Sequence, residues 1–398
     1  MTRVATFREV LAHAGDGVRR ILGPVGDEHT LRRAAAVAWS VIAEPGDGIA
    51  GAVRAVYGDA SAYDRLVAGD EVSAAATETG LDPRALAAAR DRWRPRAAAE
   101  LLAEPLRRAA ACGARVLVPG EEAWPAALDD LGPHAPACLW VRGDPAALHP
   151  VGIALVGARA ATSYGEHVAG ELAAGIAQAG TPVVSGAAYG IDGAAHRAVL
   201  AVGGVTVAFL AGGCDRLYPA GNGTMLERIV TTGAVVGEVP CGAAPTKWRF
   251  LARNRLIAAV TGATVVVEAG ARSGSLNTAG HAAALGRPLG AVPGPVTSAA
   301  SVGTHRLLRE YDARCVTSAA DALELIGHGE PAPLPLGGFT DDRVRVRDAL
   351  SRRVYRETGA VAAASGLAPA EVEAVLGMLL LDGAVEHGPA GWRLAAPR

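Results

Sequence analysis

Basic and aromatic residues alternate in one short segment of the chain, KWRFLARNR (247–255). It holds four cations and two aromatic rings within nine residues. Cations neutralise phosphates and rings stack on unpaired bases, so this pattern is typical of single-stranded nucleic-acid binding. The alternative is a solvated basic start of a helix.

Two observations favour a ligand over a solvated helix start. The helix dipole opposes positive charge at a helix N-terminus, so cations there need an anion or another reason to be present. In addition, Lys247 is the single lysine among 38 lysines and arginines. We therefore expect that a compact, flexible ammonium is required here, where a planar guanidinium would not fit.

Two glycine-rich segments have the composition of phosphate-binding turns. In VGARAATSYGE (156–166), Gly157 allows close approach of a ligand and Arg159 is placed to pair with a phosphate, although a structural glycine in a tight turn is the alternative. In EAGARSGSLNTAGHAAALG (268–286), backbone amides and hydroxyl groups are expected to hold an anion at a helix N-terminus, without the GK[ST] of a P-loop. The predicted phosphate-cradling positions in these and two further segments are Gly157, Ser185, Gly186, Gly212, Gly213, Gly274, Ser275 and Thr278.

The two further segments carry polar side chains with open interpretations. In SGAAYGIDGAAH (185–196), Asp192 and His196 have the spacing of a metal pair or a catalytic dyad, but a first-turn acid and a packing histidine explain them more simply. In AGGCDRLYPAGN (211–222), Asp215 and Asn222 are expected polar anchors, and the Tyr-Pro pair forms either a turn or a stacking surface.

Catalytic and metal-binding residues are not predicted. Ser185 is no nucleophile elbow, because Val183 stands where GxSxG requires glycine. The five cysteines are odd in number, widely spaced and never CxxC, which argues against a disulfide framework and a zinc site. Residues 269–309 contain no carboxylate before Arg309. We therefore expect no enzyme activity, no metal and no cofactor.

Nine short apolar runs alternate with amphipathic segments and must position these residues. Continuous Val/Ile/Leu runs separated by helices predict a doubly wound, mostly parallel α/β sheet, and such sheets bind ligands beyond the carboxyl ends of their strands. Ser163 with Glu166 predicts a capping box at the first helix. The runs are 114–120, 137–143, 152–159, 182–188, 205–213, 234–240, 263–270, 288–294 and 314–318.

The order of the segments predicts the domains. Residues 31–110 are Ala-rich, Arg-studded and helical, like a SAM or helix-hairpin-helix domain, and follow an extension (1–30). The doubly wound α/β domain spans 111–327, and a proline- and glycine-rich linker spans 328–341. Three helices and two short strands predict a winged-helix-like domain at 342–398, whose recognition helix is acidic and therefore unsuited to the major groove.

Composition excludes other classes of protein. With 398 residues, 50% hydrophobic and 20% charged, the chain is a folded protein of roughly two to three domains. No apolar run reaches the roughly 18 residues of a membrane span, and no signal peptide is visible, so we expect a cytoplasmic protein without a membrane partner. The net charge of −2 allows a nucleic-acid site only as a local patch.

Taken together, the motifs resemble the DNA-processing protein A (DprA/Smf) family of bacterial recombination mediators. The resemblance covers roughly residues 31–394, and its motifs are VGARAATSYG, SGAAYGID, LAGGCDRLYP, FLARNRLIA, VVVEAGARSGSLNTA and AVPG. It implies an extended Rossmann domain that binds single-stranded DNA, forms a homodimer and helps to load the RecA recombinase. The DNA groove that it implies consists of Arg159, Lys247, Phe250, Arg253, Asn254 and Arg255.

Two departures and two competing hypotheses accompany the resemblance. Trp124 replaces the family's usual tyrosine, and Asn277 stands at a usually aliphatic position.

A nucleotide-binding or nucleotide-hydrolysing Rossmann enzyme, similar to phosphoribohydrolases, would need a glutamate after its glycine-rich loop, and residues 269–309 have none. A dinucleotide-dependent oxidoreductase would need GxGxxG and a ribose-binding acid, which are also missing.

Overall fold

The computed structural model describes residues 21–22, 28–149, 151–328 and 341–395. The chain divides into two compact units, residues 1–329 and 330–398, and each is described by itself. Most of the predicted extension (1–30) and nearly all of the predicted linker (328–341) lie outside the described residues.

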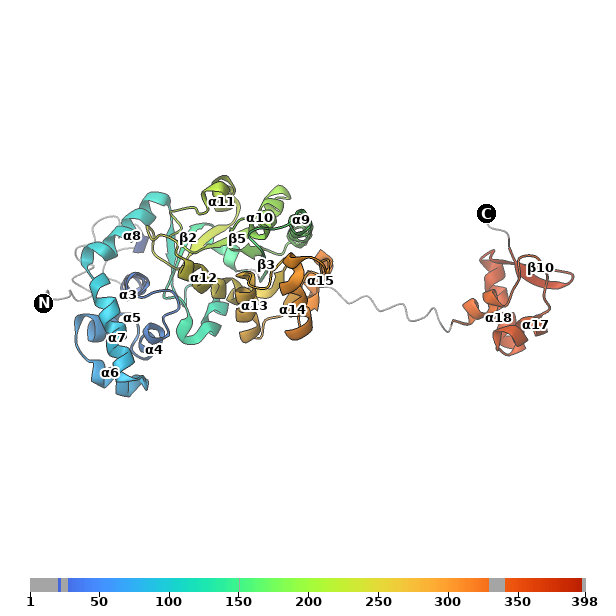
Figure 1. Cartoon of the computed structure of the whole chain (residues 1–398), viewed down its shortest axis with the longest axis horizontal. Helices are drawn as coiled ribbons and strands as arrows, with labels where there is room; N and C mark the ends of the chain where they lie inside the picture. Colours follow the sequence, from blue (N-terminus) through green and yellow to red (C-terminus); the bar gives the residue numbers. More distant parts are fainter. Residues whose placement is uncertain (1–20, 23–27, 150, 329–340, 396–398) are drawn as a thin grey trace. The chain divides into compact units, whose positions relative to one another are not determined.

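A nine-stranded sheet forms the centre of the first unit (Figure 1), and each predicted apolar run contributes one strand. The spatial order is β1-β2-β6-β5-β4-β3-β7-β8-β9, in which β2 is antiparallel to both of its neighbours, β1 and β6, and all other neighbouring pairs are parallel. The predicted doubly wound, mostly parallel sheet is confirmed. The strands are β1 Arg115–Leu117, β2 Leu139–Gly143, β3 Gly152–Val156, β4 Val183–Ser185, β5 Thr206–Leu210, β6 Ala234–Gly237, β7 Thr261–Val266, β8 Leu289–Ala291 and β9 Arg314–Cys315.

Helices cover both faces of this sheet, which is why its strands are apolar throughout. In β3 all five residues are buried, with Ile153 and Leu155 packed in one cluster and Ala154 and Val156 in another. The first face carries α9 Ser163–Gln178, α10 Ile191–Ala201, α11 Gly223–Thr232 and α15 Ala319–Glu324. The second face carries α12 Lys247–Ala259, α13 Ser275–Ala284 and α14 Val302–Glu310.

Helix α9 begins one residue earlier than the capping box predicts. Thr162, and not Ser163, is the N-cap, and its hydroxyl oxygen accepts a hydrogen bond from the Gly165 amide at 3.1 Å. The buried Glu268 carboxylate fixes Thr162 by accepting from its amide at 2.9 Å and from its hydroxyl at 2.6 Å. This contact across 106 residues decides the position of the cap.

The N-terminal helices pack against the β1–β2 end of the sheet (Figure 1). Trp39 and Trp93 meet edge to face at 5.1 Å in a buried cluster that continues to Trp140 in β2. The helices predicted as domain 31–110 therefore share a core with the sheet. They are α3 Glu28–Ile42, α4 Gly48–Tyr57, α5 Asp59–Ala62, the π-helical turn Tyr63–Ala68, α6 Val72–Thr79, α7 Pro83–Trp93 and α8 Ala99–Cys112.

The second unit has the predicted element order and its own core. Helices α16 Asp342–Asp348, α17 Thr358–Ser365 and α18 Pro369–Leu381 precede the hairpin of β10 Val385–Gly388 and β11 Gly391–Leu394. Its assignment to the winged-helix class stays a prediction. In the described part of the chain no single helix has the length and apolar composition of a membrane span, and α17 with α18 meets that test only as a pair bent by 104°.

Candidate nucleic-acid interface

A cleft of about 680 Å³ opens where the strand order of the sheet reverses, between β3 and β7. The chain leaves these two neighbouring strands toward opposite faces, so their loops diverge and leave a crevice, as expected for open α/β sheets. The loops after β3 and β7 and the helix α12 supply most of its walls. The lining residues used below are Arg159, Asp192, Lys247, Phe250, Arg253, Asn254, Arg272, Ser275 and Thr278.

Arg253 forms the floor of this cleft. Its guanidinium donates hydrogen bonds to the Gly186 carbonyl at 2.8 Å and to the Phe209 carbonyl, and its Nε donates to the Asn254 side chain at 3.2 Å. A Cβ atom at Gly186 would collide with the guanidinium, so glycine is required there by the arginine. Arg253, a predicted groove residue, thus joins the loop after β4 to the end of β5 and also lines the cleft.

Asp192 balances the charge of Arg253 beside the cleft. Its carboxylate accepts hydrogen bonds from the Gly186 amide at 3.1 Å and the Ala188 amide at 3.4 Å. Burial raises the pKa of Asp192 and lowers the pKa of Arg253 to about 10, and each charge opposes the shift of the other. The Asp192 carboxylate is therefore already engaged by the backbone of the loop after β4.

An aromatic and cationic stack stands at the edge of the cleft. The Arg159 guanidinium lies over the Phe250 ring at 4.5 Å, and the Tyr218 ring lies 6.0 Å from Phe250 at 53°. A second hollow of about 100 Å³ lies beside it and shares Arg159, Ala188 and Phe250 with the main cleft. The stack thus separates two adjoining hollows, and Tyr218 contributes a ring to the smaller one.

The side chains of two exposed cations at the cleft form no hydrogen bond or ion pair with any residue that the structure describes. They are Lys247, the first residue of α12, and Arg272, in the loop after β7. Arg159 has the Phe250 ring as its contact and is likewise exposed. Sequence reasoning missed Arg272, although a cation inside a glycine- and hydroxyl-rich loop before a helix is a signal for it.

The N-terminus of α13 also faces the cleft through Gly274, Ser275 and Thr278. The Ser273 and Ser275 hydroxyls lie 2.8 Å apart, and the Asn254 amide donates to the Gly274 carbonyl at 3.3 Å. The same amide lies 3.3 Å from the Asn277 side-chain oxygen. Asn277, the departure from the family pattern, thus contacts a predicted groove residue.

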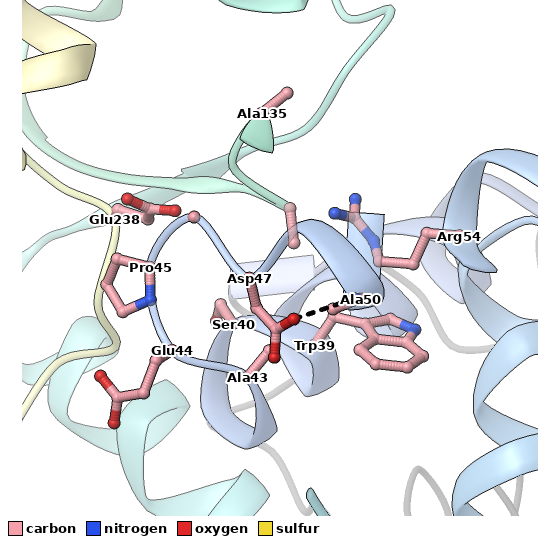
Figure 2. A pocket seen from close by; sticks show the side chains of 12 residues that line it. Trp39, Ser40, Ala43, Glu44, Pro45, Asp47, Ala50, Arg54, Ala135 and Glu238 are labelled. Atoms are coloured by element: carbon pink, nitrogen blue, oxygen red, sulfur yellow. Dashed lines mark hydrogen bonds between the residues drawn. The ribbon is translucent and has the colours of Figure 1, made fainter. Parts of the chain in front are cut away.

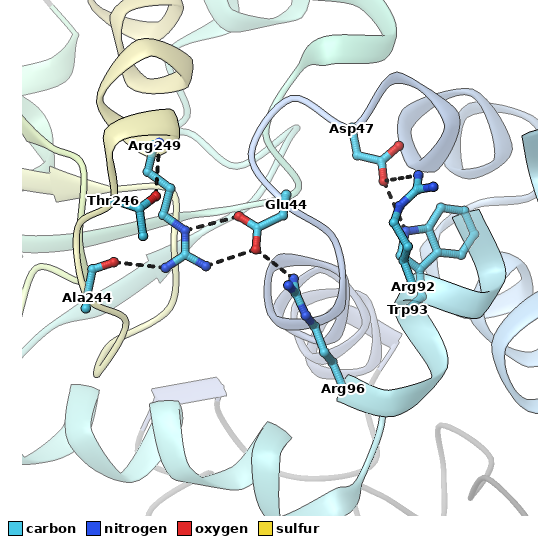
Figure 3. A network of polar contacts seen from close by, with 8 residues as sticks. All are labelled: Glu44, Asp47, Arg92, Trp93, Arg96, Ala244, Thr246 and Arg249. Carbon is cyan, nitrogen blue, oxygen red and sulfur yellow. Dashed lines mark hydrogen bonds and ion pairs between the residues drawn. The ribbon is translucent and has the colours of Figure 1, made fainter. Parts of the chain in front are cut away.

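The other face of α12 carries arginines that are already paired. Arg249 forms two hydrogen bonds of 3.1 Å with Glu44, and Glu44 also pairs with Arg96 at 2.8 Å (Figure 3). Arg255, predicted in the DNA groove, is buried instead in a pair of 2.7 Å bonds to Glu238. Its Nε and Nη2 also donate to the His134 carbonyl, at 3.0 and 2.8 Å, so it is not available to a ligand.

Several predicted phosphate-cradling groups are likewise used inside the protein. The Ser185 hydroxyl donates to the Leu155 carbonyl at 2.6 Å, the Gly186 amide donates to Asp192, and the Gly213 amide donates to the Ala243 carbonyl at 3.0 Å. Gly212 lines the smaller hollow, and Gly157 lines the main cleft. Among the predicted cradling positions, the structure thus brings Gly157, Gly274, Ser275 and Thr278 together at one cleft.

His196 is a packing residue. The Thr206 hydroxyl donates to the Val183 carbonyl at 2.7 Å, so its oxygen accepts from Nδ1–H of His196, also at 2.7 Å. Burial lowers the pKa of His196 to about 3, which keeps the ring neutral. Among the described residues, no group of three or more His, Cys, Asp and Glu side chains is arranged to hold a metal ion.

A separate hollow of about 30 Å³ lies at the turn between α3 and α4 (Figure 2). It is lined by Glu44, Asp47 and Glu238, and each of these carboxylates has its own partner: Arg249, the amides that start α4, and Arg255. A volume of this size holds about one water molecule. It is therefore not a second ligand site.

Comparisons of sequence and of fold relate this chain to the same group of known proteins. Residues 115–327 match the family described as DNA recombination-mediator protein A. The chain is 48% identical over 302 residues to a DNA processing protein DprA of Mycobacterium tuberculosis, which covers 71% of this chain and 77% of the relative. It is 38% identical over 195 residues to protein Smf of Escherichia coli, covering 49% and 52% of the two chains.

A solved structure agrees as well. The crystal structure of DNA processing protein A from Streptococcus pneumoniae superimposes with a TM-score of 0.59 at 27% identity, covering 75% of this chain and 97% of that one. The family match spans more than half of the chain and includes both β3 and β7, whose loops form the cleft. This chain therefore belongs to the DNA processing protein A family, and it acts in the processing of DNA for recombination.

Proposed function

We propose that the cleft between β3 and β7 binds single-stranded DNA. The observation that carries this proposal is the set of three exposed cations without carboxylate partners, Arg159, Lys247 and Arg272, around one cleft that also holds an aromatic ring. Phosphates supply the missing negative charge. The N-terminus of α13 adds backbone amides to the same site.

Aromatic rings at the cleft give a preference for single strands. The Phe250 ring borders both hollows, and Trp248, two residues earlier in α12, is 60% exposed. A ring stacks on the face of a base only when the base is unpaired, and such stacking is worth roughly 1–3 kcal/mol per base. The net charge of −2 gives no general attraction to duplex DNA, so the local cleft decides the affinity.

The bound strand is then passed on, in this proposal, to the RecA recombinase, and the protein works as a homodimer. Transfer to RecA is supported by membership of a family described as recombination mediators, and the homodimer is what the resemblance to that family implies. A mediator holds single-stranded DNA and transfers it to a recombinase. The second unit contributes packing or protein contact, because α18 carries Glu371 and Glu373 and no cation.

The proposal excludes catalysis by this protein. Asp192 is the one carboxylate among the cleft-lining residues, and two backbone amides together with Arg253 engage it. Glu268 lies nearby but is occupied by Thr162. A free carboxylate that could serve as general acid or base is therefore not found in the described lining of the cleft, and no nucleotide or metal cofactor is part of the proposal.

Binding of fluorescent DNA tests the proposal. We expect oligo-dT to bind more tightly than a blunt duplex of the same length, and free AMP to compete weakly. Equal affinity for oligo-dT and the duplex would contradict it.

Hydrolysis of AMP or ATP is the second measurement, with heat-inactivated protein as control. We expect no turnover. Turnover that disappears on Asp192→Asn or Glu268→Gln would establish the enzyme hypothesis instead.

A further inference from the structure

Three of the five cysteines meet at one place in the first unit. Cys112 is the last residue of α8, Cys214 follows β5, and Cys241 follows β6. The Sγ atoms of Cys214 and Cys241 lie 3.7 Å apart, and Cys112, whose thiol donates to the Ala109 carbonyl at 3.5 Å, packs against the same buried cluster. Cys214 and Cys241 meet because β5 and β6 are parallel neighbours, so the loops that follow them leave the same edge of the sheet. The wide spacing of the cysteines in the sequence gave no sign of this cluster.

The two loops that carry Cys214 and Cys241 are already joined by hydrogen bonds. The Gly213 amide donates to the Ala243 carbonyl at 3.0 Å, and the Gly242 amide donates to the Asp215 carboxylate at 2.8 Å. A disulfide has an S–S distance of about 2.05 Å, so the two sulfurs need to approach by about 1.7 Å. The geometry is thus that of a reduced pair one small movement from a bond.

Access to this pair runs through Cys112. Cys214 and Cys241 are 0% and 3% exposed, whereas Cys112 is half-buried. Hydrogen bonds from the Cys214 and Cys241 thiols lower the pKa of Cys112, so it is the thiol of the three that ionises first. The thiolate is the nucleophile in cysteine chemistry, and Cys112 is also the one residue of the three that is not fully buried.

We propose that Cys112, Cys214 and Cys241 form a peroxide-reactive site that closes a Cys214–Cys241 disulfide. The Cys112 thiolate attacks one oxygen of hydrogen peroxide, the O–O bond breaks, and the cysteine becomes a sulfenic acid while hydroxide leaves and takes up a proton as water. A neighbouring thiol of the cluster then attacks that sulfur and releases a second water. The third thiol attacks this mixed disulfide, which forms the Cys214–Cys241 bond and returns Cys112 as a thiol. Two thiols lose two hydrogens and two electrons, and one peroxide is reduced to two waters.

The disulfide would act on the cleft through the two loops, a step that rests on the proposed function. Four residues after Cys214, Tyr218 lies beside Phe250, and six residues after Cys241, Lys247 begins α12. Because the sulfurs have to approach, at least one of these loops shifts relative to the other. We expect the oxidised protein to bind single-stranded DNA several-fold more weakly than the reduced protein.

Mass spectrometry of the full-length protein tests the site itself. After a short treatment with hydrogen peroxide, we expect the loss of two hydrogen atoms per chain and a non-reduced peptide that links Cys214 to Cys241. Cys214→Ser and Cys241→Ser abolish this peptide, and Cys112→Ser slows its appearance. Cys315→Ser is the matched control, because Cys315 is an exposed thiol in β9 outside the cluster, and this variant keeps the linked peptide.

Other products would overturn the proposal. These are Cys112 oxidised to sulfinic acid with Cys214 and Cys241 still reduced, chains linked through Cys315 alone, or a stoichiometric bound zinc that protects all three thiols. If Cys112→Ser does not fold, iodoacetamide labelling of the wild type replaces it, and labelling of Cys214 or Cys241 before Cys112 contradicts the entry route. DNA titration is kept separate: reduced protein that fails to bind oligo-dT refutes the proposed function, whereas equal binding by both redox forms refutes the coupling.

Discussion

The two faces of α12 contain the same kinds of residue in different circumstances. Toward the cleft, Lys247 has no partner among the described residues, and Arg159 reaches over Phe250 from the loop after β3. On the opposite face, Arg249 and Arg255 each hold a carboxylate from elsewhere in the chain. Lys247, on the cleft face of the helix, has no carboxylate partner in the described part of the chain, whereas both arginines on the opposite face have one.

This difference shows why counting cations does not locate a binding site. Four cations in nine residues suggest a single basic surface, but Arg249 and Arg255 are paired with carboxylates elsewhere in the chain, and Arg253 is buried against two backbone carbonyls. Only the partners decide which cations remain for a ligand. Four predictions, from the largest expected effect to the smallest, test whether the two faces are as distinct as their contacts indicate.

Removal of Arg255 should have the largest effect, and on stability alone. Arg255→Ala leaves Glu238 buried without its countercharge, and breaking such a buried pair costs about 3–5 kcal/mol. Urea denaturation measures the free energy of unfolding. The salt dependence of DNA binding by the folded protein should stay as in the wild type.

Two variants serve as controls for Arg255. Arg306→Ala removes an exposed pair with Glu310 and should leave the free energy of unfolding close to that of the wild type, because solvent screens such a pair. Arg255→Ala with Glu238→Gln should recover part of the loss, since no buried charge remains. A reduced salt slope for Arg255→Ala would instead show that Arg255 contacts a DNA phosphate.

Phe250→Ala should weaken binding without changing its salt dependence. The variant removes stacking worth roughly 1–3 kcal/mol per base and leaves the number of phosphate contacts unchanged. Titration of oligo-dT at several salt concentrations gives both quantities. Tyr311→Ala is the matched control, because it removes a similar ring beneath Arg306 in α14, and it should bind like the wild type.

Lys247→Ala should weaken binding about equally for all sequences and reduce the log–log salt slope by about one unit or less. Lys247→Arg should also lose affinity, because this arginine-rich chain uses its single lysine here. Arg309→Ala, which removes an exposed cation of α14, is the control. A folded Lys247→Ala protein with wild-type affinity and slope would place the groove elsewhere.

Glu44→Gln should have the smallest effect, and it should depend on pH. Desolvation raises the pKa of Glu44, but Arg249 and Arg96 together lower it further, so the net pKa lies below its ordinary value of 4.5. The stability from this pairing is therefore complete above about pH 4.5 and is lost as the pH falls through the lowered pKa. At pH 7 we expect a loss of at most about 1 kcal/mol, since Glu44 is partly exposed.

Thermal unfolding of wild type and Glu44→Gln across this pH range provides the measurement. The two stability curves should converge at acid pH. A constant difference down to pH 3 would mean that the substitution acts through packing and not through charge.

The sequence predicted the fold better than the pairing of its charges. Short continuous apolar runs predicted all nine strands, because the hydrophobic pattern of a segment is a local property. The antiparallel direction of β2 and the cap at Thr162 depend on contacts between distant segments. The Glu44–Arg249 pair spans 205 residues, so no local pattern could separate Arg249 from Lys247.

The composition of the cleft also has a practical consequence for labelling chemistry. Lys247 is exposed and carries the single side-chain primary amine of all 398 residues. An amine-reactive ester therefore modifies one side chain, and that side chain borders the cleft. A fluorophore or crosslinker can be attached there in the unmutated protein, and the rate of acylation with and without a candidate ligand reports directly on occupancy of the cleft.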